Sequence, residues 1–338
     1  MILRPKPFLS RRAVPSGGSS VVPMATVPAW LRRAIPDAQS VADKNVEDIA
    51  LVAGAAIGAL DAAVRRDEKW AGAWRQRLAL SAAAITARQA GRVEGEAALR
   101  DAVLLTRPGD DVGPAGRMLL AWRRLAGTPV EKLLTEAGIG AVLGDFGLAR
   151  DDERVSELTV DLHQLAASGG TVAMLTGAIA SAERRGYGRP LGAFIADALL
   201  AHRLGWTHAV PLLGAEAALA AGAARRRRDL EFGAQASEMK PDRAKSLLAA
   251  QARAALRAID FSAELSRRAD RLLAVAPKLR AKAADTVVEK LLSDDAIVAS
   301  EKIAGISDRG LRRLFDRLVE LGAVRELSGR PTFRIYGL

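Results

Sequence analysis

Cysteine is absent from this 338-residue chain, and histidine occurs only three times. Without a thiol the chain can form no disulfide, no thiolate nucleophile and no cysteine-ligated zinc or iron–sulfur centre. With so few histidines a metal site is not expected either, and no cofactor is predicted. Aromatic residues make up 4% of the sequence against 49% hydrophobic residues in total. The core is therefore expected to consist mainly of alanine, leucine and valine, which favours a mainly α-helical fold.

Long hydrophobic runs are missing as well. No stretch reaches the roughly 18 consecutive apolar residues of a membrane-spanning helix. The basic N-terminal segment has no apolar core of about 7–15 residues, so it does not resemble a secretory signal. We therefore expect a cytoplasmic protein with no membrane partner.

Local signatures of catalysis are also absent. The chain contains no phosphate-binding loop, dinucleotide-binding glycine pattern, nucleophile elbow, paired-histidine zinc motif or calcium loop. No catalytic residue is predicted, and a non-enzymatic role is favoured. An enzyme of unrecognised type stays open as an alternative, with Asp110, Asp111 and Arg117 as its charged residues.

Positive charge is in excess, with a net charge of +11 and a pI of about 10.5. A balance of this kind favours acidic partners, of which nucleic acid is the first candidate. The length suggests about two domains. We predict a flexible basic arm over residues 1–45, an α-helical domain over 46–276 and a separate module over 277–338.

Three tryptophans lie on the predicted inward faces of helices in the first half of the chain. Trp70 and Trp74 are one helical turn apart, and Trp122 lies in a later helix that has Pro114 in its first turn. Aromatic stripes at helical spacing are typical of a core. We interpret all three as structural rather than as parts of a ligand site.

The module over 277–338 has the chain order of a winged helix-turn-helix. A helix with apolar residues at 284, 287, 288 and 291 comes first, and a short helix is expected over 300–304. Ser307 is a suitable N-cap for a third helix that ends near Gly322. The predicted buried face of this helix consists of Leu311, Leu314, Phe315, Leu318, Val319 and Leu321, and its arginines lie on the other face. Strands over 324–327 and 332–336 then form a small β-hairpin. The predicted fold is thus a multi-helix domain followed by a winged helix-turn-helix.

The module carries twelve Lys and Arg residues against nine Asp and Glu, an excess of three. In a helix-turn-helix the recognition helix lies in the major groove, where arginine pairs with guanine edges or phosphate. We therefore predict double-stranded DNA as the partner. The predicted DNA-binding residues on the third helix and the hairpin are Arg309, Arg312, Arg313, Arg317, Arg325 and Arg330. The alternative is a scaffold protein whose module contacts a protein partner or a second copy of the chain.

Three stretches carry a resemblance to a known family. They read WAGAWRQRLAL from Trp70, EAALRDAVLLTRPGDDVGPAGR from Glu96 and LLAWRRLA from Leu119. The chain resembles an uncharacterised alphaproteobacterial family, known mostly from rhizobial replicons, called domain of unknown function 1403. Because that family has no assigned activity, the resemblance implies relatedness and no mechanism. The ending is also similar to the winged helix appended to Fic-type proteins, but the Fic catalytic motif is absent.

Overall fold

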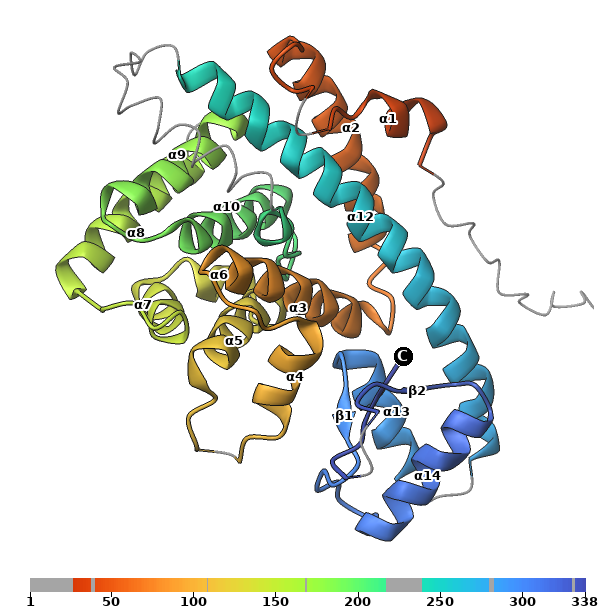
Figure 1. Ribbon diagram of the computed structural model, residues 1–338. Helices are drawn as coiled ribbons and strands as arrows, with labels where there is room; N and C mark the ends of the chain where they lie inside the picture. Colours follow the sequence, from red (N-terminus) through yellow and green to blue (C-terminus); the bar gives the residue numbers. More distant parts are fainter. Residues whose placement is uncertain are drawn as a thin grey trace, which may run out of the picture.

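The computed structural model describes residues 27–37, 40–107, 109–167, 169–216, 239–279, 283–329 and 332–338. The protein is mainly helical and has one small sheet near the C-terminal end (Figure 1). None of the helices in these ranges is long and apolar enough to span a membrane. The first part of the chain forms the helical body, residues 27–279. Its elements are α1 (Ala29–Ala34), α2 (Val46–Val64), α3 (Ala71–Gln89), α4 (Glu96–Leu104), α5 (Gly113–Gly127), α6 (Val130–Leu133), α7 (Glu136–Asp145), α8 (Asp152–Ala167), α9 (Thr171–Arg184), α10 (Arg189–Leu204), η1 (Leu213–Ala215), α12 (Met239–Val275) and η2 (Ala276–Lys278).

Helix α12 is the longest element and runs along one side of the molecule, from α9 to the C-terminal elements (Figure 1). It packs against α2 along much of its length. Helix α1 is attached to the same pair of helices, because Leu31 is buried and Arg32 forms an ion pair with Asp260 of α12. Packing therefore begins inside the segment predicted as an arm. Residues 1–26 of that arm lie outside the described residues.

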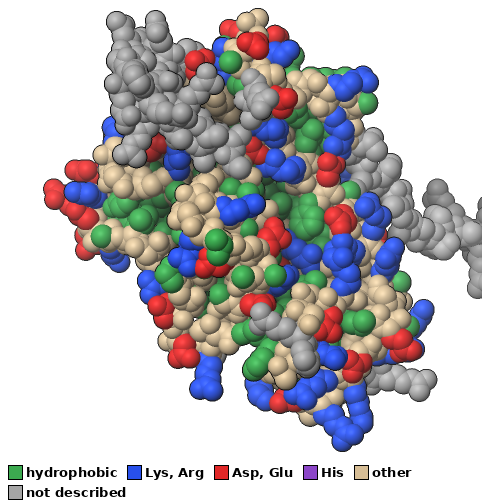
Figure 2. Space-filling view, viewed as in Figure 1, with side chains coloured by type: hydrophobic (Ala, Val, Ile, Leu, Met, Phe, Trp, Pro, Cys, Tyr) green, Lys and Arg blue, Asp and Glu red, His purple; other side chains and the backbone are tan. Residues whose placement is uncertain are grey.

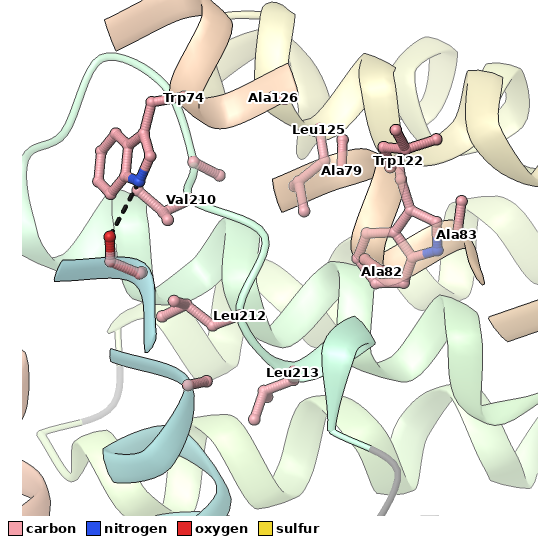
Figure 3. Close-up of a cluster of buried hydrophobic side chains, with 14 of the residues drawn as sticks. Trp74, Ala79, Ala82, Ala83, Trp122, Leu125, Ala126, Val210, Leu212 and Leu213 are labelled. Carbon is pink, nitrogen blue, oxygen red and sulfur yellow. Dashed lines mark hydrogen bonds between the residues drawn. The ribbon is translucent and has the colours of Figure 1, made fainter. Parts of the chain in front are cut away.

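The core of the body is built from alanine, leucine and a few aromatic rings, as the composition predicts. Trp70, Trp74 and Trp122 are all buried, which confirms their predicted inward positions. The Trp74 indole N–H donates to the Ala258 carbonyl oxygen of α12 at 3.0 Å (Figure 3). The Trp122 indole N–H donates to the Thr86 hydroxyl oxygen of α3 at 3.0 Å. The indole N–H groups of Trp74 and Trp122 are therefore both satisfied inside the core.

Asp197 of α10 is a buried carboxyl group at the centre of this body, 1% exposed. Its Oδ2 atom accepts hydrogen bonds from the backbone N–H groups of Leu212 and Leu213, at 2.8 and 3.0 Å. Burial raises the pKa of Asp197 to about 8, and the two N–H donors oppose this shift only in part. The carboxyl group therefore holds the backbone at the start of η1 in place. When it is ionised, its charge is poorly solvated.

We expect this group to make stability fall as pH rises. The folded-state pKa lies above the unfolded value of about 3.9, so the folded protein holds this proton more tightly. The contribution of Asp197 to the free energy of unfolding is complete below about pH 4 and is lost as pH rises toward about 8. An Asp197→Asn variant keeps an oxygen acceptor for both N–H groups but does not ionise. Melting temperatures measured from acid to mildly alkaline pH should decline less for the variant than for the wild type; parallel profiles would contradict the assignment.

The C-terminal unit, residues 283–338, contains α13 (Ala284–Ser293), β1 (Ile297–Val298), α14 (Asp308–Glu320), β2 (Arg325–Glu326) and β3 (Ile335–Gly337). The strands form an antiparallel sheet in the order β1-β3-β2. Two features differ from the sequence prediction. The short helix expected over 300–304 is replaced by turns and extended chain. The strand β1 was not predicted, because two apolar residues carry no periodicity of their own.

The C-terminal unit packs directly against the body. Arg123 of α5 forms an ion pair with Asp295, whose side chain is 2% exposed. Gly72 of α3 lies so close to Ser293 that a Cβ atom on Gly72 would meet the Ser293 carbonyl oxygen at 2.7 Å. The C-terminal unit is therefore closely packed against the helical body. Independent folding of residues 277–338 stays a prediction.

Candidate nucleic-acid interface

Helix α14 has a defined start and one apolar face. Ser307 is its N-cap as predicted: its hydroxyl oxygen accepts a hydrogen bond from the Gly310 N–H at 3.2 Å. Phe315 stacks on Tyr336 of β3, with ring centroids 4.4 Å apart and planes 5° apart. Three leucines complete the buried face, at positions Leu311, Leu314 and Leu318. Val319 was predicted to be buried with them but is 39% exposed, since it lies at the edge of the apolar stripe. The opposite face of α14 is thereby fixed toward solvent.

Unpaired positive charge stands on the first half of that outer face. Arg309, Arg312 and Arg313 are exposed. Within the described ranges, none of the three forms an ion pair. They span about 6 Å along the helix axis, at 1.5 Å per residue. Lys and Arg side chains project at the end of the molecule where α14 lies (Figures 1 and 2). The structure thus brings these three predicted residues together on one surface.

The second half of the same face is electrically balanced. Arg317 is exposed, but its Nη1 atom pairs with the Glu320 Oε2 atom at 2.7 Å. Asp316 lies 3.6 Å from Arg334, measured between Oδ1 and Nη1. Before the helix, the Lys302 ammonium group pairs with Asp308 and lowers the pKa of that carboxyl group. Arg317 therefore brings less free charge to the surface than the three arginines before it.

The two predicted arginines of the hairpin have different outcomes. Arg325 lies on β2 and is exposed. Burial lowers the pKa of Arg77 and of Arg268 in the helical body, and the charge of Arg325 acts in the same direction. Arg330 lies outside the described residues.

A recess between α14 and the hairpin was not predicted from the sequence. Its volume is about 470 Å³, and Arg312, Phe333 and Arg334 are among its lining residues. Phe333 is 63% exposed and has a φ of 59°, a left-handed conformation that is rare for an aromatic residue. Strand alternation had placed Phe333 within a strand over 332–336, whereas β3 begins only at Ile335. No local signal marks a residue that turns outward ahead of a strand.

The acidic loop before α5 does not assemble a second site. Arg117 binds Asp111 through two contacts, Nε to Oδ1 and Nη2 to Oδ2, both at 3.1 Å. Asp111 Oδ1 also accepts from the Gly113 N–H at 3.0 Å, as in a capped loop. Among the residues that the structure describes, no group of three or more His, Asp or Glu side chains is placed to hold a metal ion. The alternative enzyme reading therefore gains no support from this loop.

The residues described above fall within a single family match. The sequence from residue 18 to residue 338 matches the family described as protein of unknown function (DUF1403). The chain belongs to the DUF1403 family. No curated protein matches the chain. The predicted relationship to this family is thus confirmed, and the matched residues include α14 and its arginines.

Proposed function

We propose that this DUF1403 protein binds double-stranded DNA through its C-terminal unit, as a cytoplasmic transcriptional regulator or replicon-associated factor. The observation that carries the proposal is the group of three exposed arginines on the first half of α14, which form no ion pair with any residue that the structure describes. The order helix, strand, helix, hairpin and the sheet order β1-β3-β2 support a winged-helix arrangement. In that arrangement α14 is the recognition helix and the hairpin is the wing.

The chemistry of the three side chains suits a duplex. A guanidinium group presents a rigid fork of N–H donors that pairs with two phosphate oxygens or with the O6 and N7 atoms of guanine. The arginines lie next to the N-terminus of α14, where the helix dipole also favours anions. The buried face of α14 is rigidly held by Phe315 and Tyr336, so the arginines are presented without a loop rearrangement.

Protein contact is the second candidate, and one observation favours it. Phe333 exposes an apolar ring next to Arg312, at the rim of the recess between α14 and the hairpin. Aromatic residues and arginines together are enriched where proteins bind proteins. In this alternative the C-terminal unit binds a partner protein or a second copy of the chain, and the arginines lie at the polar edge of that interface.

The test is duplex affinity as a function of salt, measured by fluorescence anisotropy with a labelled duplex of about two helical turns. If all three arginines touch phosphate, log K should fall with log salt with a slope near −2.7. Affinity should then drop roughly 40-fold between about 50 and 200 mM salt. Should the protein fail to bind any duplex at the lowest salt, the protein-contact function replaces the proposal.

A further inference from the structure

A cavity of about 410 Å³ opens in the helical body, and the described residues that line it all belong to that body. It lies where α3, α5, the segment after α7 and the start of α10 meet (Figure 1). Its wall is mainly apolar and includes Met118, Phe146, Leu148, Pro190 and Leu191. The cavity is thus within the size range of small-molecule sites and separate from the exposed surface of α14.

Thr86 of α3 brings a buried hydroxyl group to this cavity. The residue is 3% exposed, and its oxygen accepts a hydrogen bond from the Trp122 indole N–H at 3.0 Å. The hydroxyl proton, by contrast, has no acceptor among the residues that the structure describes. Three other threonines, Thr106, Thr159 and Thr176, donate this proton to the backbone carbonyl oxygen four residues earlier. Because a buried donor without an acceptor is unfavourable, the Thr86 hydroxyl group indicates a ligand that accepts a hydrogen bond.

The start of α10 gives the cavity a positive character. Its N-cap, Gly188, has no side chain to accept from the N–H groups of the first turn, and the helix dipole favours an anion there. Arg189 also lines the cavity. Its Nε atom lies 3.8 Å from the Glu183 Oε1 atom, while Arg243 binds the Oε2 atom of Glu183 at 2.8 Å. Among the described residues that line the cavity, none is an Asp or Glu.

We propose that the helical body binds a small carboxylic acid with an apolar, ring-sized body in this cavity. The ligand's carboxylate pairs with Arg189 at the start of α10, and a ligand oxygen accepts the hydrogen bond from Thr86. The apolar part packs against Met118, Phe146 and Leu148. A carboxylate carries one charge, which matches the single arginine of the described lining. A phosphate, with about −1.5 to −2 charges at neutral pH, is matched less well.

Calorimetric titration with β-naphthoate tests the proposal without DNA, so its result is separate from that of the duplex assay. We expect the wild-type protein to bind β-naphthoate with a Kd of about 10–100 µM. The neutral β-naphthamide has the same ring system but no charge. It should bind about tenfold more weakly, because the charge-assisted hydrogen bonds to the carboxylate are lost.

Two variants separate the polar groups of the site. An Arg189→Met variant keeps an unbranched side chain but no charge; it should bind β-naphthoate about tenfold more weakly and β-naphthamide as the wild type does. The matched control is Arg88→Met, which removes an exposed arginine of α3 that does not line the cavity and should leave both affinities unchanged. A Thr86→Val variant should bind β-naphthoate about three- to tenfold more weakly. It also removes the acceptor of the Trp122 indole, so circular dichroism must show that it is folded.

The proposal is overturned if the wild type binds no β-naphthoate at about 1 mM ligand. It is equally overturned if β-naphthamide binds as tightly as β-naphthoate, or if Arg189→Met binds β-naphthoate as the wild type does, since the cavity then recognises no anion. Tighter binding of β-naphthyl phosphate than of β-naphthoate contradicts the carboxylic acid and assigns a phosphate ester instead. Because Arg189→Met changes no buried core contact of Trp122, these outcomes do not depend on the Thr86 variant folding.

Discussion

Replacing Arg309, Arg312 and Arg313 together by alanine is expected to abolish duplex binding and to leave the fold intact. All three side chains are exposed and lie opposite the buried face of α14, so their removal opens no cavity. Each phosphate contact that is lost should make the salt slope of log K shallower by about 0.9, so the slope should change by two to three. A base contact that is lost should instead cost about 1–3 kcal/mol at one sequence position.

The control for this prediction is a variant with the same change in net charge elsewhere. Arg33, Lys69 and Arg107 are exposed side chains of the helical body, and replacing them by alanine also removes three positive charges. This control variant should bind duplex with nearly the wild-type slope. Circular dichroism should give the same helix content for all three proteins. Equal losses of affinity in both triple variants would show that net charge, and not the surface of α14, attracts the DNA.

Replacing Trp122 by alanine is expected to lower the free energy of unfolding by about 3–5 kcal/mol. The ring is fully buried and has Phe146 and Phe194 as aromatic neighbours, each with its centroid 6.1 Å away. The change also leaves the buried Thr86 hydroxyl oxygen without its indole donor. Gly214 of η1 packs so closely on the ring that an added Cβ would lie 2.3 Å from the Trp122 Cη2 atom, so the ring fills the space between α5 and η1.

Urea unfolding followed by circular dichroism measures this effect. Trp30→Ala is the matched control, because Trp30 is 50% exposed and should lose little stability. Duplex binding by the Trp122 variant should be unchanged at temperatures where it remains folded. A Trp122 variant with wild-type stability that has lost a ligand would show that the ring belongs to a site and not to the core.

Local patterns in the sequence were sufficient to predict most of the helices. The 3.6-residue periodicity predicted α3 and α13, and Ser307 marked the start of α14, because caps and apolar stripes depend on neighbours within one or two turns. The same periodicity placed the three arginines of α14 on one face before any contact was known. It did not set the width of the buried stripe, which is why Val319 was predicted to be buried.

The sheet and the recess near Phe333 could not be predicted from local sequence patterns. Strand β1 is two residues long and pairs with β3, almost forty residues later in the chain. Short strands acquire their structure from a distant partner, so their own sequence contains little information about them. Phe333 lies just before β3 begins, and the backbone turn there, rather than alternation, directs its ring to solvent.

The sequence by itself determined that the chain is mainly helical, that Trp70, Trp74 and Trp122 are buried and that α14 presents Arg309, Arg312 and Arg313 together. Only the tertiary structure decided how the C-terminal unit is attached and which charged side chains pair with each other among the described residues. Arg123 pairs with Asp295, which lies 172 residues later in the sequence, and Arg77 donates to Leu338, which lies 261 residues later. Pairings at such separations depend on how whole helices pack, since burial and not spacing selects which arginine meets which oxygen.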